Sequence, residues 1–458
     1  MKNGIDMKPG QTFPLTIKRL GINGEGVGYF KRKAVFVPGA LPGEEITAEA
    51  VKVMPKFTEA VVKKLRKPSP ERVTPPCDIY EKCGGCQLQH LSYEGQLREK
   101  KELVVQALDR YTSFNIDKLT IHDTIGMDDP WRYRNKAQFQ TGVYKGKMIM
   151  GLYSTNSNQL VNIEECIVQH KAVDETIRLA KKLMNKLSIP VYSAKNKQGV
   201  KTIVVRYGFE TGDVQAVVVT GDKTFPKAEE FAKQLMKLKP RVKSVVHNIN
   251  PGKTHLVMGD VSKTIAGSDT ISEELGEFEY ELSARAFFQL NPVQTKKLYD
   301  EVKKAANVQP SDKVTDAYCG SGTIGLWIGK NAAEVRGMDT IAASIKDARA
   351  NAEKYGVKAT YEVGPAEKWL PIWKEKGWVP DVLVTDPPRT GLDPKLIETI
   401  KQIQPSVFVY VSCNPSTLAK DLVALAPVYK IDSIQPVDMF PQTAQVETVV
   451  KLTVKSKS

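Results

Sequence analysis

The sequence predicts a multidomain α/β protein with a small N-terminal OB-like β-barrel, a central α+β domain and a C-terminal, doubly wound, Rossmann-like domain. The chain has 458 residues, which is enough for two to four domains. Short strands separated by glycines fill its beginning, which is typical of a barrel. After residue 290, short apolar strands alternate with helical segments, which favours a parallel sheet.

The barrel is expected within residues 6–67. Strands are predicted at 15–20, 34–37 and 45–51 because β-branched and aromatic residues cluster there between glycines. A basic run at residues 63–67 leads into four prolines, and this proline-rich exit indicates a domain boundary.

The central domain is expected to be interrupted by a helix at residues 92–110. Another helix is predicted at residues 171–187, between strands. In the last domain, strands are expected at residues 314–317, 334–337, 381–385 and 407–411. The predicted domains are the barrel at residues 6–67, the central domain at 75–92 and 125–265, and the C-terminal domain at 93–124 and 266–458.

The charge balance points to a polyanionic partner. The net charge is +14 and the isoelectric point is near 9.2. Phosphate contacts supply most non-specific affinity for nucleic acid, so a nucleic acid fits this charge. A solvated basic surface that only keeps the protein soluble is the alternative.

Neither a membrane span nor a signal peptide is expected. No apolar stretch approaches the roughly 18 residues of a spanning helix, and the first residues lack an apolar core. We therefore expect a cytoplasmic protein whose thiols stay reduced. No obligate protein partner is inferred.

Four of the six cysteines have the spacing of a metal site: Cys77, Cys83, Cys86 and Cys166. A C-x2-C pair in a reduced compartment indicates metal binding or redox chemistry. Four thiolates suit either zinc or a 4Fe-4S cluster, and the spacing alone favours zinc.

A glycine loop at residues 316–325 follows a predicted strand and opens a helix. It contains G-x-G-x-x-G, and Asp339 follows after the next strand, where an acid can hold the ribose of an adenosine-type cofactor. This pattern alone does not separate NAD from S-adenosylmethionine. The late position of the loop and the turn Asp386-Pro387-Pro388-Arg389 at a strand end favour S-adenosylmethionine.

Cys413 is the candidate nucleophile. It ends the apolar strand at residues 407–411, at the edge of a parallel sheet where ligands bind. Cys319 competes with it, but lies inside the cofactor loop and is expected to be a small packing residue.

Glu447 is the candidate base. Carbon 5 of uracil becomes nucleophilic after a thiolate adds to carbon 6, and a base must then remove the carbon-5 proton. Glu447 follows a polar turn and precedes an apolar strand, which suits that role. Without Cys413 the preferred interpretation is a solvated glutamate at a strand edge.

Five segments occur in one order along the chain and together resemble the RNA uracil-5-methyltransferase family. They are residues 289–291, 316–322, 386–389, 412–415 and 443–447. The N-terminal segment at residues 37–44 resembles the RNA-binding TRAM barrel. The Cys83-Gly84-Gly85-Cys86 segment resembles the iron–sulfur site of the branch of the family that acts on 23S ribosomal RNA.

The resemblance implies a role for each matching residue. Cys413 would be the nucleophile and Glu447 the base. S-adenosylmethionine would be contacted by Gln289, Tyr318, Asp339 and Asp386. A 4Fe-4S cluster would be held by Cys77, Cys83, Cys86 and Cys166. We expect it to have a structural or RNA-positioning role rather than a redox role, because methyl transfer moves no net electrons through it. One departure is Gln445, where many family members have a histidine.

The leading hypothesis is methyl transfer from S-adenosylmethionine to carbon 5 of uridine in 23S rRNA, with tRNA as the alternative substrate. An RNA cytosine-5-methyltransferase is disfavoured, since a second cysteine is then expected where Arg389 stands. An NAD enzyme leaves Cys413 and Glu447 without a task. A non-catalytic RNA-binding iron–sulfur protein does not explain the catalytic segments.

The RNA is expected to contact the barrel, the basic run at residues 63–67 and the segment 131–136. In that segment Trp131 and Tyr133 alternate with Arg132 and Arg134, so it could stack a base and hold phosphates. A buried uracil must also leave its stack to reach a catalytic thiol.

Overall fold

The structure is a computed structural model that describes residues 7–155, 157–252 and 256–456. The expected outer domain limits, at residues 6 and 458, lie outside the described residues. No helix in the described part of the chain is long and apolar enough to cross a membrane.

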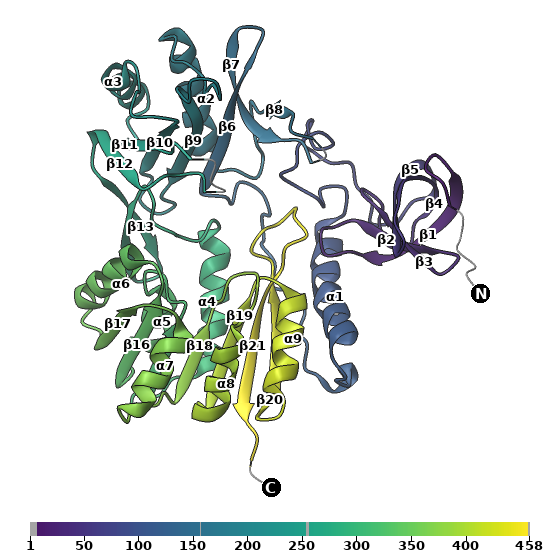
Figure 1. Ribbon diagram of the computed structural model, residues 1–458, viewed down its shortest axis with the longest axis vertical. Helices are drawn as coiled ribbons and strands as arrows, with labels where there is room; N and C mark the ends of the chain where they lie inside the picture. The colour runs from purple at the N-terminus through teal and green to yellow at the C-terminus, as the bar shows by residue number, and fades with distance from the viewer. Residues whose placement is uncertain (1–6, 156, 253–255, 457–458) are drawn as a thin grey trace. The chain divides into compact units, whose positions relative to one another are not determined.

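The chain divides into two compact units, and the order of their elements can be followed by colour in Figure 1. Unit 1 comprises residues 1–76, 86–128 and 297–458. Unit 2 comprises residues 77–85 and 129–296. Each unit is therefore built from segments that are distant in the sequence.

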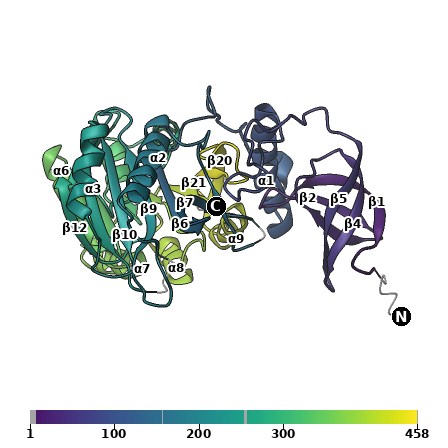
Figure 2. The ribbon, with the colours of Figure 1, turned by 90° about the horizontal axis from the view of Figure 1, so that it is seen from above.

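Unit 1 begins with a closed five-stranded barrel, which confirms the expected N-terminal domain (Figure 2). Alternate side chains of the first strand, Phe13, Leu15 and Ile17, are buried inside it. The strands, in barrel order, are β1 (Thr12–Leu20), β2 (Gly26–Phe30), β3 (Lys33–Val37), β5 (Phe57–Lys67) and β4 (Glu45–Val53).

The basic run at residues 63–67 belongs to β5, the last strand of the barrel. β5 pairs antiparallel with β4 and parallel with β3, so it closes the barrel. Its lysines and arginine point outward and obscured the strand pattern in the sequence.

The C-terminal part of unit 1 is a seven-stranded sheet, which confirms the Rossmann-like expectation. Five strands are parallel, and β21 is inserted antiparallel beside β19. In sheet order the strands are β17 (Ala359–Val363), β16 (Glu334–Asp339), β15 (Lys313–Ala317), β18 (Val382–Thr385), β19 (Val407–Ser412), β21 (Glu447–Val454) and β20 (Tyr429–Val437).

Helices cover this sheet. Side chains of α1, α7, α8 and α9 share one core with β19 and β21, including Leu108, Trp373, Leu396, Leu418 and Phe408. The helical segments are α1 (Tyr93–Tyr111), the 3-10 turn η1 (Ile116–Lys118), α4 (Pro292–Ala306), α5 (Thr323–Gly329), α6 (Ala342–Lys354), α7 (Ala366–Glu375), α8 (Pro394–Ile403) and α9 (Pro415–Leu425).

Unit 2 is a second seven-stranded sheet with two helices packed side by side against it, α2 (Lys171–Lys186) and α3 (Ala228–Leu238) (Figure 2). The sheet order is β12 (Val261–Gly267), β11 (Val242–Ile249), β10 (Val214–Thr220), β9 (Val200–Tyr207), β6 (Lys136–Tyr144), β7 (Lys147–Tyr153) and β8 (Leu160–Asn162). A separate hairpin follows, formed by β13 (Thr270–Leu275) and β14 (Phe278–Ser283).

Candidate active site

The carboxyl-terminal edge of the parallel strands of unit 1 gathers the candidate residues. β15, β18 and β19 lie in register, with Ala317 paired to Thr385 and Thr385 paired to Tyr410. Tyr318 and Asp386 therefore leave their strands at the same edge. In open α/β sheets ligands bind at this edge, so it is the candidate active site.

Cys413 and Glu447 face each other at this edge. The terminal pair of β19 and β21 joins Ser412 to Thr448. One further step in an antiparallel register sets Cys413 opposite Glu447. Both residues are half-buried.

Cys413 also lies at the N-terminal end of α9. The Oδ1 of Asn414 accepts a hydrogen bond from the N–H of Ser416 at 3.1 Å and so caps the helix. Pro415 takes the first helical position, where its missing N–H costs nothing. The N-terminus of a helix stabilises a nearby thiolate.

The charges around Cys413 shift the pKa of its thiol in opposite directions. Burial raises the pKa of its thiol to about 11, and the charges of Glu447 and Asp386 add to this rise, whereas Arg389 lowers it. The thiol is therefore protonated at neutral pH in this state. The thiol becomes a better nucleophile when a neighbouring carboxylate takes its proton. Loss of negative charge from a neighbouring carboxylate has the same effect, because it lowers the pKa of the thiol.

Glu447 and Asp386 are both poised for proton transfer. Burial raises the pKa of Glu447, and the charge of Asp386 raises it further, while Arg389 opposes the rise. Burial also raises the pKa of Asp386. Carboxyls with a raised pKa can give and take protons near neutral pH, as general acid–base chemistry requires.

Arg389 is held beside this pair by the start of α9. Its backbone carbonyl accepts hydrogen bonds from Asn414 Nδ2 at 3.0 Å and Thr417 Oγ1 at 3.3 Å. Sequence reasoning used Arg389 only to disfavour a second cysteine and missed its electrostatic role. The signal was present, because its turn and Cys413 end adjacent parallel strands.

The backbone conformation of the glycine loop allows a cofactor to approach it closely. Tyr318, Gly320 and Gly322 all have positive φ, at 65°, 54° and 79°. The carboxylate of Asp339 holds the loop, since it accepts from the N–H of Gly320 at 3.0 Å and of Ile341 at 2.9 Å. A non-glycine residue at positive φ stores strain, which is common at ligand sites.

Asp316 lies beneath this loop and is fully buried. Its Oδ2 accepts from the N–H of Gly325 at 2.7 Å, and in the described part of the chain its Oδ1 has no hydrogen-bond partner. Burial raises its pKa to about 7, with the charges of Asp386 and Asp339 adding to the rise. A buried oxygen that lacks a partner is available to a donor group of a ligand.

Cys319 is buried within the same loop, with 5% of its surface exposed. Burial and the charges of Asp316 and Asp339 raise the pKa of its thiol well above the usual range. Such a thiol is inert, which agrees with the expectation of a packing residue.

The segment that leads to Glu447 is fastened by α1. Lys100 and Asp438 form a fully buried ion pair, and Lys100 Nζ also donates to the carbonyl of Phe440 at 3.1 Å. Tyr93 Oη donates to Asp438 Oδ2 at 2.9 Å. These contacts fix the turn before the candidate base, and nothing local in the sequence indicates them.

A second contact between α1 and this segment is reciprocal. Gln96 Nε2 donates to Gln442 Oε1 at 3.0 Å, and the N–H of Gln442 donates to Gln96 Oε1 at 2.9 Å. The carbonyl of Gln442 accepts from the N–H groups of Gln87 and Leu88, each at 2.9 Å. The residues directly after Cys86 are therefore tied to the turn that carries the candidate base.

The candidate metal ligands are divided between the units. Cys77, Cys83 and Cys166 lie in unit 2, and Cys86 begins a segment of unit 1. Cys83 and Cys166 pack against the same core, and burial raises the pKa of Cys83, with the charge of Cys77 adding to the rise. In the described residues, no group of three or more His, Cys, Asp or Glu is arranged to hold a metal ion.

Arg132 braces the segment that carries Cys166. Its Nη1 donates to the carbonyl of Cys166 at 3.0 Å and to Asp174 Oδ2 at 2.9 Å, and its Nη2 pairs with Glu165. These bonds occupy the guanidinium and favour a structural role over the predicted RNA contact.

The sequence also singled out Gln289 and Gln445. Gln289 belongs to unit 2, where its backbone carbonyl accepts from Asn135 Nδ2 at 3.2 Å. Its role toward a cofactor stays a prediction. Gln445, two residues before Glu447, is exposed.

Comparison with protein families gives two matches. The family described as tRNA (Uracil-5-)-methyltransferase matches residues 375–455, which include Asp386, Cys413 and Glu447. The TRAM domain family matches residues 7–63, which lie in the barrel.

Similar proteins match the chain over nearly its full length. An RNA methyltransferase of Halalkalibacterium halodurans, named as uncharacterized, is 55% identical over 98% of both chains. A similarly named protein of Listeria monocytogenes is 52% identical over 99% of this chain and 100% of its own.

One solved structure is similar throughout. The Pyrococcus abyssi tRNA (uracil-54, C5)-methyltransferase, in complex with S-adenosyl-L-homocysteine, has a TM-score of 0.76 and 29% identity, covering 96% of this chain and 100% of its own. The chain therefore belongs to the RNA uracil-5-methyltransferase family, as an S-adenosylmethionine-dependent enzyme with an N-terminal TRAM domain.

Proposed function

We propose that this enzyme methylates carbon 5 of uridine in 23S ribosomal RNA through a covalent bond to Cys413. The observation that carries the chemistry is the pair Cys413 and Glu447, which face each other across β19 and β21 beside Asp386. A thiol and a carboxyl at facing positions of two adjacent strands can act on adjacent carbons of one pyrimidine ring.

In the proposed mechanism an ionised carboxylate beside Cys413 takes the proton of its thiol, and the resulting thiolate adds to carbon 6. The electron pair of the 5,6 double bond moves toward the carbon-4 carbonyl. S-adenosylmethionine would supply the methyl group to carbon 5 and would leave as S-adenosylhomocysteine. Glu447 then takes the proton from carbon 5, and the returning electron pair expels the thiolate of Cys413. Arg389 would stabilise the thiolate at the start and at the end of this cycle.

The residues at the glycine loop fit S-adenosylmethionine. Tyr318 and Asp339 line a backbone cradle of positive φ, and Asp316 below it has a buried oxygen open to a donor. We propose that Tyr318, Asp339 and Asp386 contact this donor, together with Gln289 of unit 2.

We further propose that Cys77, Cys83, Cys86 and Cys166 hold a 4Fe-4S cluster with a structural role. The support is the donor chemistry, four thiols, and the shared packing of Cys83 and Cys166 on one core. Methyl transfer moves no net electrons through such a group. Gln87 and Leu88, which follow Cys86, donate hydrogen bonds to the carbonyl of Gln442. A cluster bound at Cys86 would therefore help to fix the turn that precedes Glu447.

Metal analysis tests the cluster. Protein purified without oxygen is expected to contain iron and sulfide, and C86S and C166S should lose them. C413S is the matched control and should keep them, because Cys413 lies outside the proposed ligand set. Stoichiometric zinc without iron would replace the cluster by a zinc site.

Two RNA substrates compete. The cysteine set resembles that of the 23S rRNA branch, whereas the similar solved structure is a tRNA (uracil-54, C5)-methyltransferase. The test is to map 5-methyluridine in both RNAs from a strain that lacks the gene. Loss from 23S rRNA alone supports the proposal, and loss from tRNA alone assigns the alternative.

A further inference from the structure

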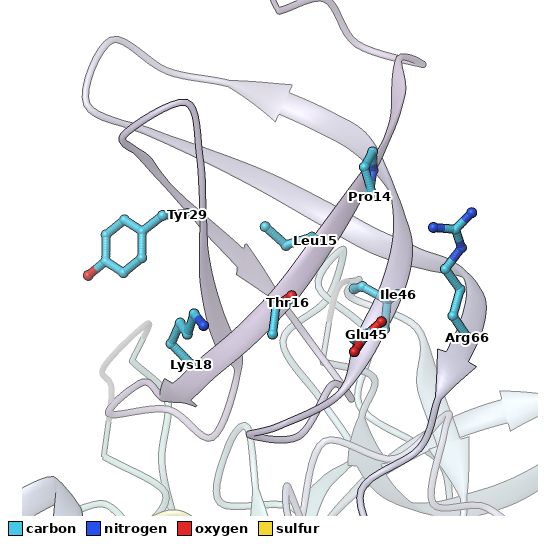
Figure 3. Close-up of a pocket in the computed structure, with 8 residues that line it drawn as sticks. All are labelled: Pro14, Leu15, Thr16, Lys18, Tyr29, Glu45, Ile46 and Arg66. Atoms are coloured by element: carbon cyan, nitrogen blue, oxygen red, sulfur yellow. The ribbon is translucent and has the colours of Figure 1, made fainter.

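The outer face of the barrel carries a row of side chains across four strands. Thr16 of β1 is paired with Glu45 of β4, and one step beyond the Ile17–Gly28 pair sets Thr16 opposite Tyr29 of β2. Arg66 of β5 completes the row beside Glu45. These residues line a hollow of about 280 Å³ (Figure 3).

The barrel is far more basic than the rest of the chain. Residues 7–67 contain twelve lysines and arginines against five glutamates, so they carry half of the net charge of +14. Two of these cations, Lys18 and Arg66, line the hollow and are exposed. A polyanion is therefore the ligand that this face attracts.

The hollow offers an aromatic surface together with these cations. The ring of Tyr29 is at the rim and is 53% exposed, although tyrosine is usually more buried. An exposed aromatic ring flanked by cations can stack an unpaired base while the cations hold the adjoining phosphates.

We propose that this hollow binds one unpaired nucleotide of the RNA substrate, at a site separate from the catalytic one. Tyr29 stacks the base, and Lys18 and Arg66 contact the phosphates on either side. The proposal deepens the proposed function, since it adds a second contact point on the same RNA.

Glu45 gives the hollow a base preference. Its carboxylate is in the row between Thr16 and Arg66, where it can only accept hydrogen bonds when ionised (Figure 3). Adenine, cytosine and guanine carry an exocyclic amino group that donates to a carboxylate, and uracil carries none. The hollow therefore selects against uracil, so it does not compete with the catalytic site for the target base.

Binding of dye-labelled, single-stranded oligoadenylate to the full-length protein tests the site. Y29A should weaken binding about tenfold, because stacking on an aromatic ring contributes about that factor per base. Y29W should retain binding, and RNA should quench its fluorescence. K18A/R66A should reduce the slope of log affinity against log salt by about 1.4, or 0.7 per lost phosphate contact.

The matched control is K52A/K56A, which removes the same charge from exposed barrel positions outside the hollow. An equal change of salt slope in both double variants, or wild-type binding by Y29A, would overturn the proposal. E45Q should reduce the ratio of the affinity for oligoadenylate to that for oligouridylate several-fold. An unchanged ratio of affinities would overturn the base preference.

These results are separable from the proposed catalytic function. All the barrel variants should still form the Cys413 adduct at saturating RNA, because they leave the catalytic site intact. Loss of RNA binding with a normal adduct supports the hollow, whereas a missing adduct in wild-type protein with normal RNA binding contradicts only the catalytic proposal.

Discussion

Cys413 and Glu447 occupy facing positions at the ends of β19 and β21, one residue beyond the Ser412–Thr448 pair. This relationship depends on β21 running antiparallel in an otherwise mostly parallel sheet, which brings the start of one strand beside the end of another. Asp386, from the end of β18, adds a third ionisable group whose charge acts on both. The pair therefore has the arrangement needed for addition at one ring carbon and proton removal at the next.

The first prediction separates the two roles. C413A should form no covalent adduct with RNA that contains 5-fluorouridine, because no thiolate remains to add to carbon 6. E447Q should accumulate a methylated adduct with ordinary RNA, because the carbon-5 proton stays in place and the thiolate is not released. Denaturing gels with labelled methyl donor measure both.

C319A is the control for this experiment and should form the fluorouridine adduct as wild type does. An adduct that persists in C413A would show that another nucleophile acts. Rapid turnover by E447Q, with no trapped species, would assign the proton removal to a different base.

The second prediction concerns the pH dependence of thiol alkylation, measured without RNA by mass spectrometry of the Cys413 peptide. Because the pKa of Cys413 is raised to about 11, its alkylation should be slow at neutral pH and rise steadily into the alkaline range. E447Q removes a negative neighbour, so its profile should shift to lower pH. The shift should be largest where Glu447 of the wild type is ionised.

R389A should shift the same profile in the opposite direction, because the positive charge that lowers the thiol pKa is lost. R32A removes a distant exposed arginine of the barrel and should leave the profile unchanged. A common profile for wild type, E447Q and R389A would mean that these charges do not act on the thiol.

The sequence predicted the parts of the site that depend on strand ends. Cys413 and Asp386 each follow a short apolar run, and such runs in an alternating α/β pattern place their ends at one edge. The sequence could not predict that Lys100 and Asp438 form a buried pair, because the partners are separated by 338 positions. Similarly, the cations of β5 masked its alternation, so no strand is predicted at residues 57–67, although the barrel is expected to extend to residue 67.

The third prediction uses two glycines of the cofactor loop. Gly320 and Gly322 both have positive φ, so alanine at either should cost about 1–2 kcal/mol of backbone strain. A Cβ at Gly322 would also lie 2.9 Å from Tyr361 Oη and 3.2 Å from Ala348 Cβ, whereas among the described residues nothing lies within 4 Å of one at Gly320. G322A should therefore lose more thermal stability than G320A.

Binding of S-adenosylhomocysteine by calorimetry completes this comparison. G320A should bind it more weakly, because its added carbon would enter the space that the cofactor is proposed to occupy. The fold should stay close to wild type, because among the described residues nothing lies within 4 Å of that carbon. Equal stability of the two variants would contradict the steric account of Gly322.

The last prediction concerns the buried pair that fastens the catalytic turn. Lys100 and Asp438 are both fully buried, so K100M leaves a buried carboxylate without its cation and should destabilise unit 1 by about 3–5 kcal/mol. K100M/D438L removes both charges and should recover most of that stability. Y93F removes two hydrogen bonds, the one donated to Asp438 and the one accepted from the N–H of Met127, and should cost about 2 kcal/mol. Chemical denaturation monitored by the fluorescence of the unit 1 tryptophans measures all three.

Because the pair fixes the turn before Glu447, the double variant should fold yet release its covalent adduct more slowly than wild type. A double variant that is stable and fully active would restrict the pair to a stabilising role.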